Sequence, residues 1–231
     1  MNVSVVIRTK NEERWIDRCL RALSLQVGCS FEVVVVDNQS TDRTLELLKN
    51  HACRLETIAD ADFTHGRSIN QGIRSRPSDF VAILSGHCVP LSERWLERLL
   101  APFSDPTVAG VYGRQEPLPD SSPFDKRDLW TTFGLDRRVQ VNDWFFHNAN
   151  SMIRRSVWDQ LPFDEEIDGV EDRDWAKRVQ ERGYRIVYEP RAAVFHHHGI
   201  HQGRDEKRAQ RVARVIELIQ KNKSERRAGE A

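Results

Sequence analysis

The chain has 231 residues, of which 39% are hydrophobic and 30% charged, and its 35 Lys and Arg residues balance its 35 Asp and Glu residues. This composition excludes a disordered chain, and the balanced charge excludes a nucleic-acid-binding protein that depends on net positive charge. The length suits one large α/β domain or two small ones, and no apolar run reaches the ~18 residues that a membrane-spanning helix needs.

The amino-terminal residues and the cysteines indicate a cytoplasmic protein. Met1 and Asn2 lead directly into an apolar strand, without the basic segment that opens a signal peptide. The cysteines lack the close spacing of a zinc knuckle or a disulfide framework. They are Cys19, Cys29, Cys53 and Cys88. We therefore expect reduced thiols and a cytoplasmic location.

The first part of the chain alternates strands and helices. Buried strands are expected at Val3–Ile7 and Phe31–Val36, because both are apolar runs rich in β-branched residues. The spacing indicates βαβ units on a parallel sheet, with the loops after both strands at one edge. The expected helices are Trp15–Leu25, with Asn11 as N-cap, and Thr44–Asn50, with Thr41 or Asp42 as N-cap.

Asp37 follows the second strand and has two interpretations. An acid just past a strand end can accept hydrogen bonds from a base or a ribose. It can equally be a loop acid or a helix N-cap. Neither GxGxxG nor GxxxxGK[ST] occurs in the sequence, so the chain carries no dinucleotide fingerprint and no P-loop.

The middle of the chain contains the strand around which the rest is organised. Phe80–Leu84 is expected to be a buried central strand, and Pro90 is expected to end any further pairing. Between them lies Ser85-Gly86-His87-Cys88, at the kind of strand end where open α/β sheets bind ligands. The alternative is a glycine turn with a solvated histidine and a buried structural cysteine. Before this strand, Arg54–Ile58 is expected to be a short strand and Phe63–Gly72 a loop that continues into a helix ending at Gly72.

Arg67 lies near the start of that helix and is suited to a phosphate.

Further along, three prolines in Gln115–Pro123 interrupt regular structure. Phe124–His147 mixes aromatic and charged residues, which form either an acceptor wall or a second core. The remaining expected helices and strands are Ser92–Leu100, Val108–Tyr112, Asn148–Ile153, Arg154–Leu161, Asp172–Arg182 and Tyr184–Glu189.

Phe163–Asp174 is a dense acidic segment that leads into a helix. Acids in a first helical turn interact favourably with the helix dipole, which is one explanation. The other is that Glu171 or Asp172 projects into a cleft as a general base, with its pKa tuned by burial or by a neighbouring carboxylate. The segment therefore has a structural and a catalytic interpretation.

Consecutive histidines occur within Ala192–His201, after the last expected strand. One of them can supply a metal ligand, but consecutive residues rarely bind one ion together, and a hydrogen-bonded or solvated cluster is the alternative. Arg204–Arg227 is expected to be a basic amphipathic helix, which either packs on the domain or lies on an anionic membrane surface.

Several segments match a known pattern in the same order: VSVVIRTKNEERWI, VVVVDNQSTDRT, ILSGHCVP, and GVEDRDWAKR followed by GYRIVYEPRAAVFHHH. Together they resemble family 2 glycosyltransferases of the GT-A fold over nearly all of residues 1–199. FTHGRSIN is similar to the FxHGxxxN of bacterial rhamnosyltransferase-like members. The resemblance implies an α/β domain with a mostly parallel central sheet and helices on both faces.

The resemblance also implies an activity and a domain organisation. The activity is inverting transfer of a sugar from a nucleotide-diphosphate-sugar to a hydroxyl of a glycan or lipid-linked acceptor, in cell-surface polysaccharide synthesis. The glycosyltransferase domain would span 1–203, with a nucleotide-sugar-binding half (1–114) and an acceptor and catalytic half (115–203). A basic amphipathic tail (204–231) would follow, with a peripheral membrane contact as one of its roles.

The family's motifs assign roles to individual residues. Glu171-Asp172 matches the ED motif, whose aspartate is taken as the catalytic base, and Asp37 matches the acid that binds the base or ribose. The nucleotide-sugar-binding residues that the resemblance implies are Thr9, Lys10, Glu12, Asp37, Asn38, Arg67, Ser85, Gly86 and His87.

One departure from the family leaves metal dependence open. Most relatives carry an Asp-rich DxD-type motif where this chain has Ser85-Gly86-His87-Cys88. Mg²⁺ and Mn²⁺ prefer carboxylate oxygens, whereas histidine suits more azaphilic ions. Either a divalent ion such as Mn²⁺ or Mg²⁺ is bound with His87 and His198 as ligands, or the leaving diphosphate is neutralised without a metal by His87, His196–His198 and Arg67 or Arg173.

Two other functions stay open. A sugar-nucleotide nucleotidyltransferase has a related sheet, but it would carry a Gly-rich loop where this chain has RTKNEE. A non-catalytic relative that binds a nucleotide or a carbohydrate is the other. Glu171-Asp172 argues against it, because a binding protein needs no base beside the acceptor.

Overall fold

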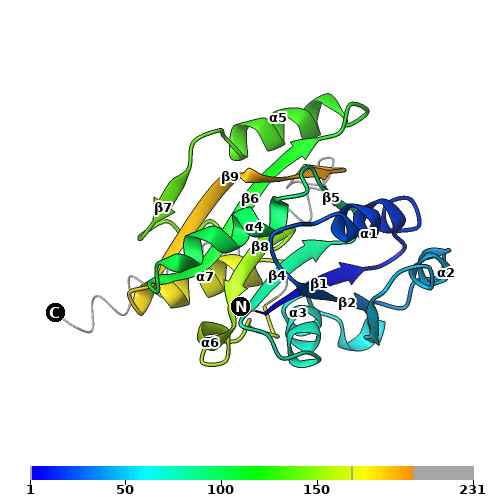
Figure 1. The fold of residues 1–231 in the computed structure, drawn as a ribbon, viewed down its shortest axis with the longest axis horizontal. Helices are drawn as coiled ribbons and strands as arrows, with labels where there is room; N and C mark the ends of the chain where they lie inside the picture. Colours follow the sequence, from blue (N-terminus) through cyan, green and yellow to red (C-terminus); the bar gives the residue numbers. More distant parts are fainter. Residues whose placement is uncertain (1, 168, 200–231) are drawn as a thin grey trace.

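The computed structural model describes residues 2–167 and 169–199, and this part of the chain forms one sheet of nine strands (Figure 1). The strand order is β3-β2-β1-β4-β8-β6-β9-β5, with β7 paired to β9 outside that path. The strands are β1 (Val3–Thr9), β2 (Phe31–Asp37), β3 (Arg54–Thr57), β4 (Phe80–Ser85), β5 (Cys88–Pro90), β6 (Val108–Pro117), β7 (Arg138–Gln140), β8 (Asn150–Arg154) and β9 (Arg185–His196).

Most of these strands run in one direction. β1 pairs in parallel with β2 and β4, β2 pairs in parallel with β3, and β6 pairs in parallel with β9. β8 lies antiparallel between β4 and β6, so β6 and β9 keep the direction of the first four strands. The short strands β5 and β7 pair antiparallel with β9. The predicted mostly parallel sheet is confirmed.

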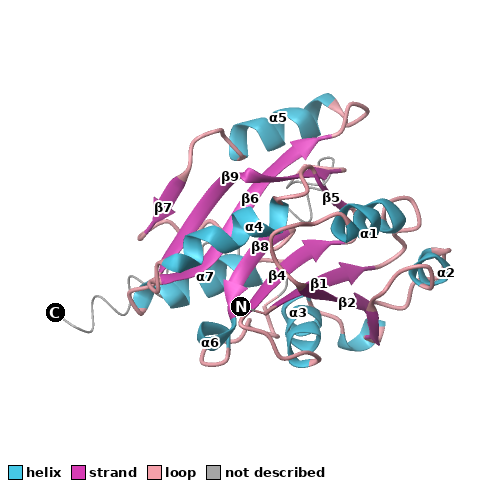
Figure 2. Cartoon of the chain, viewed as in Figure 1, coloured by secondary structure: helices cyan, strands magenta, loops and turns pink. Residues whose placement is uncertain are grey.

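Helices cover both faces of the sheet (cyan in Figure 2). One buried cluster packs α1, α2 and α4 on one face, with Trp95 and Leu20 among its members. The other packs α3, α5, α6 and α7, with Trp175 and Ile69 among its members. The helices are α1 (Ile16–Ser24), α2 (Thr44–Leu48), α3 (His65–Arg74), α4 (Trp95–Leu100), α5 (Pro123–Thr132), α6 (Arg155–Trp158) and α7 (Glu171–Glu181), with short 3₁₀ turns η1 (Asp60–Asp62) and η2 (Ala101–Ser104).

The expectation that Pro90 ends strand pairing is wrong. Cys88–Pro90 forms β5, which pairs with the end of β9 and places Cys88 opposite His196. Proline is tolerated there because β5 is an edge strand, where one backbone N–H is not needed for the ladder. This pairing brings the segment after β4 next to the late histidines.

β6 and β9 continue beyond their expected ends at Tyr112 and Glu189. β6 runs on to Pro117, and β9 passes through Pro190 to His196. The pairing of β6 with β9 shifts register between Gly113 and Gln115, and this irregularity accommodates the proline without ending the strand. The 114/115 division of the proposed halves falls inside β6.

Two helix ends differ from those expected. Asn11 does not cap α1: it has a positive φ of 54°, and its Oδ1 accepts a hydrogen bond from Thr41 N at 2.8 Å. Asn11 therefore ties the loop after β1 to the loop after β2. Gly72 does not end α3, which continues to Arg74. A Cβ on Gly72 would lie 2.5 Å from Val6 Cγ1, so this glycine allows α3 to pack closely on the sheet.

The expectation that Asp42 caps the second helix is met in part. Its Oδ1 accepts a hydrogen bond at 2.9 Å from the backbone N of Thr44, the first residue of α2.

The expected amphipathic helix at Arg204–Arg227 lies outside the described residues. Within the described ranges, no helix combines the length and the apolar character needed to cross a membrane.

Candidate active site

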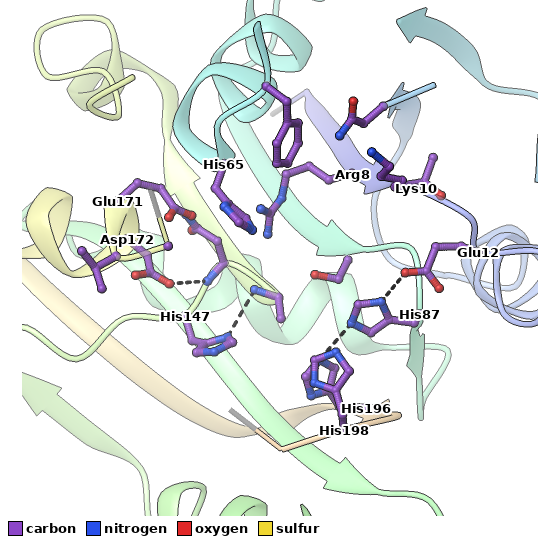
Figure 3. Close-up of a pocket in the computed structure, with 18 of the residues that line it drawn as sticks. Arg8, Lys10, Glu12, His65, His87, His147, Glu171, Asp172, His196 and His198 are labelled. Atoms are coloured by element: carbon purple, nitrogen blue, oxygen red, sulfur yellow. Dashed lines mark hydrogen bonds and ion pairs between the residues drawn. The ribbon is translucent and has the colours of Figure 1, made fainter. Parts of the chain in front are cut away.

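A cavity of about 240 Å³ lies at the carboxyl ends of β1, β2 and β4 (Figure 3). The loop before β8, the start of α7 and the end of β9 complete its wall. Its lining residues are Arg8, Thr9, Lys10, Glu12, Asn38, Phe63, His65, Ser85, His87, His147, Asn148, Ala149, Gly169, Val170, Glu171, Asp172, Arg173, His196 and His198. The structure therefore brings together Thr9, Lys10, Glu12, Asn38, Ser85, His87, Glu171, Asp172 and His198 from the predicted set.

The ends of β1 and β2 present polar atoms that lack partners. Arg8 Nε, Thr9 Oγ1 and Asn38 Oδ1 are buried and make no hydrogen bond to any described residue. Arg8 also forms no ion pair within the described chain, whereas Lys10 pairs with Asp60. Because buried polar groups are nearly always satisfied, unmet atoms in the wall of one cavity indicate a polar ligand. An arginine among them favours an anionic one.

Asp37 lies beside this cavity and does not line it. Its side chain is fully buried, and its carboxylate accepts hydrogen bonds from Ser40 N at 2.9 Å and Ser40 Oγ at 2.5 Å. These bonds fix the turn that follows β2 and so position Asn38, which does reach the cavity. Recognition of a base or ribose by Asp37 stays a prediction.

Arg67 is also outside the lining. Its Nε lies 3.3 Å from Glu165 Oε2, and its Nη1 donates to the carbonyl of Asp62 at 3.0 Å. His65, at the start of the same helix, reaches the cavity instead. Two positions along a helix differ by about 200° in direction, so only one of these two side chains can face the site.

The segment after β4 contributes both backbone and side chains. Gly86 is packed against β1: a Cβ there would lie 3.1 Å from Thr9 Oγ1 and 3.2 Å from the carbonyl oxygen of Arg8. The close approach lets Ser85 and His87 reach the cavity beside the end of β1. His87 Nδ1 lies 2.5 Å from Glu12 Oε1, so Glu12 contacts the histidine and holds its ring.

His87, His196 and His198 form one cluster at the cavity wall (Figure 3). Their candidate ligand nitrogens all lie within 4.8 Å of one another, and His87 Nε2 is 3.1 Å from His196 Nε2. Burial, reinforced by the neighbouring histidines, lowers the pKa of His196 well below its usual value, so its ring is neutral. The structure thus brings together the predicted metal pair, His87 and His198, and adds His196.

An acidic pair lies across the cavity from this cluster (Figure 3). Glu171 and Asp172 open α7, and both contact Asn148: its side-chain nitrogen lies 3.3 Å from Glu171 Oε1, and its backbone N–H donates to Asp172 Oδ2 at 3.2 Å. Burial, followed by the adjacent Glu171 charge, raises the pKa of Asp172 to about 7. A carboxylate with this pKa takes up a proton readily near neutral pH, as a general base must.

Sequence reasoning missed several residues of this cavity, among them Arg8, His65, His147 and Asn148, and it named His196 as a cation for the diphosphate but not as a metal ligand. Arg8 falls in the polar loop that the sequence predicts after β1, but β1 extends to Thr9 and Arg8 belongs to the strand. Its position at the carboxyl end of a parallel strand was the available signal.

The comparisons with known proteins decide the family. The family model described as "Glycosyl transferase family 2" matches residues 4–161, more than half of the chain. The chain belongs to glycosyl transferase family 2. The predicted family is therefore confirmed.

Curated glycosyltransferases align with most of this chain. It is 29% identical over 196 residues to the O-antigen chain rhamnosyltransferase WbaN of Salmonella anatum, an alignment that covers 80% of this chain and 62% of the relative. It is 28% identical over 195 residues to glycosyltransferase AglE of Haloferax volcanii, over 80% of this chain and 64% of the relative. The chain thus spans less than two thirds of the length of these relatives.

Solved structures confirm the fold of this family 2 chain. The mannosyltransferase PcManGT from Pyrobaculum calidifontis, in complex with GDP-Man and Mn²⁺, superposes with a TM-score of 0.66 at 23% identity, over 84% of this chain and 56% of the other. S. aureus TarS 1-349 in complex with UDP gives a TM-score of 0.69 at 18% identity, over 85% of this chain and 60% of the other. At this level of identity the superpositions support the α/β GT-A architecture alone.

Proposed function

We propose that this domain transfers a sugar, with inversion, from a nucleotide-diphosphate-sugar to a hydroxyl of a glycan or lipid-linked acceptor, in cell-surface polysaccharide synthesis. The observation that carries the proposal is the composition of one cavity. Its β1 side offers an unpaired arginine, and its α7 side offers an aspartate whose pKa is raised. The rhamnosyltransferases and other glycosyltransferases among the relatives support this assignment.

Asp172 is the proposed general base. The acceptor hydroxyl loses its proton to the Asp172 carboxylate as its oxygen forms a bond to the anomeric carbon. The bond between that carbon and the diphosphate oxygen breaks, and its electron pair stays on the diphosphate. Asn148 N and Arg173 N donate to the two oxygens of Asp172, which holds the carboxylate in one orientation.

Arg8 is proposed to contact the departing diphosphate. An arginine held at the base of a cavity stabilises the charge that develops on the leaving oxygen without reorganising during the reaction. Arg173 also lines the cavity, and its positive charge acts on Asp172. A divalent ion, when bound, would supply further positive charge to the diphosphate, and the histidine cluster has the donor atoms to hold an azaphilic one.

The two proposed halves of the domain both contribute to the cavity. Residues from 1–114 provide the unpaired polar atoms of β1 and β2, and residues from 115–199 provide His147, Asn148 and the acidic pair. This distribution supports donor binding by the first half and acceptor binding by the second. Peripheral membrane contact through residues 204–231 is a separate prediction on residues outside the described ranges.

A turnover screen tests the proposed function. The chain is incubated with UDP-, GDP- and dTDP-sugars, alone and with oligosaccharide or lipid-linked acceptors, and release of the nucleoside diphosphate is measured. We expect slow release from one donor class that an acceptor accelerates, with the sugar found on the acceptor by mass spectrometry. Binding of a nucleotide without turnover under any condition would contradict transfer and support the non-catalytic relative.

A further inference from the structure

Among the described residues, one cluster of possible metal ligands lies beside the end of β4. All of its members are histidines: His87, His196 and His198. Mg²⁺ requires hard oxygen ligands such as carboxylates, but Glu12, the acid beside the cluster, is engaged with the far nitrogen of His87. β9 ends at His196, and the chain bends at the two residues that follow it. His196 and His198 join His87, while His197 between them turns to Trp15, with ring centroids 5.3 Å apart.

Two of the three histidines, His87 and His198, have their Nδ1 beside an oxygen acceptor. This arrangement makes Nε2 of each ring the candidate metal ligand. His87 Nδ1 lies 2.5 Å from a carboxylate oxygen of Glu12, and His198 Nδ1 lies 2.9 Å from the carbonyl oxygen of Gly199. A carbonyl or carboxylate oxygen can only accept, so each Nδ1 donates a proton to it, and in the neutral ring Nε2 then carries the lone pair that can bind an ion. A carboxylate or carbonyl behind a metal-binding histidine is the usual arrangement in metalloproteins.

The spacing of the His87 and His196 nitrogens fits a shared ion. His87 Nε2 and His196 Nε2 are 3.1 Å apart. Two nitrogens that each bind one ion at ~2.1 Å lie ~3.0–3.4 Å apart at octahedral to tetrahedral angles. His196 Nδ1 is buried without a hydrogen-bond partner, so no second hydrogen bond within the described chain fixes this ring.

We propose that His87, His196 and His198 form a three-histidine site that binds a transition-metal ion such as Mn²⁺, Co²⁺ or Zn²⁺ and discriminates against Mg²⁺. Imidazole nitrogen is a good ligand for first-row transition ions, whereas Mg²⁺ demands oxygen ligands. Glu12 is the positioning residue, because it orients His87 and increases the basicity of its Nε2. The role of the ion in sugar transfer rests on the proposed function, but its binding does not.

Titration of the full chain with Co²⁺, followed by visible absorption, tests the site without any sugar substrate. We expect d–d bands that saturate at one ion per chain, that Mn²⁺ and Zn²⁺ suppress by competition, and that millimolar Mg²⁺ leaves unchanged. His196→Ala is expected to abolish the bands, and Glu12→Gln to weaken Co²⁺ binding by ~10–100-fold. His197→Ala is the matched control, since His197 belongs to the same segment and contacts Arg14 and Trp15 instead.

Circular dichroism of each variant establishes that it is folded before the titration is interpreted. Absence of bands in the native chain, equal Co²⁺ affinity in folded His196→Ala, or displacement of Co²⁺ by equimolar Mg²⁺ would each overturn the proposal. Metal binding without sugar turnover would leave the metal site established and count against the proposed function, so the two failures are distinguishable.

Discussion

Asp172→Asn is expected to lower kcat for sugar transfer by about 10²–10⁴-fold, because general-base catalysis contributes a factor of this size. The asparagine keeps the shape of the side chain but cannot accept the acceptor's proton. Donor binding should change little, because Arg8, which is proposed to contact the diphosphate, belongs to β1. Steady-state kinetics together with calorimetric titration of the nucleoside diphosphate separate the two effects.

Asp174→Asn provides the matched control for that substitution. Asp174 lies in the same first turn of α7, but its carboxylate pairs with Arg178 at 2.6 Å and does not line the cavity. We expect this variant to retain near-normal kcat. A folded Asp172→Asn variant that transfers sugar at the native rate would rule out Asp172 as the base.

Arg8→Gln is expected to weaken binding of the nucleoside diphosphate by about 10–100-fold, since a hydrogen bond to a charged group contributes ~1.5–3 kcal/mol. The physical reason is that Arg8 has no ion-pair partner within the described chain, so its charge is available to the ligand. Arg8→Gln should thus lower the affinity for the nucleoside diphosphate, whereas Asp172→Asn should lower kcat and leave that affinity nearly unchanged. Calorimetric titration of the native and substituted chains measures the change.

Arg21→Gln removes the same charge from an exposed position on α1, where Arg21 pairs with Asp17 at 2.7 Å. Its affinity for the nucleotide should match that of the native chain. If Arg8→Gln binds as tightly as Arg21→Gln does, the anion site is not at the end of β1.

The sequence predicts the local elements well because hydrophobic runs of strand length dominate the first half of the chain. β1, β2 and β4 are expected from such runs, and their parallel order follows from the intervening helices. Long-range pairing is harder to predict. Pro90 and Pro190 are local signals for a break, yet β5 pairs at a sheet edge and β9 continues past a register shift.

The candidate site is partly predictable from the sequence. The resemblance to family 2 identifies Asp172 and His87, and both line the cavity. His196 is named only among the cations for the diphosphate, because consecutive residues rarely bind one ion together. The bend after β9 brings His196 and His198 to one cluster and turns His197 to Trp15, which the sequence alone does not show. Arg67 is suited to a phosphate by its place on a helix, but only the tertiary structure shows that its side chain turns to Glu165.

The pH dependence of kcat/KM tests the central claim most directly, which is that Asp172 acts as the base in this cavity. Protonated Asp172 cannot accept a proton, so kcat/KM should rise with pH through about 7, the value to which burial and Glu171 raise its pKa, and then level off. Glu171→Gln removes the neighbouring negative charge, which lowers the pKa of Asp172 and should shift the rise to lower pH. A rise at the same pH in both chains, or none in the native chain, would contradict the account.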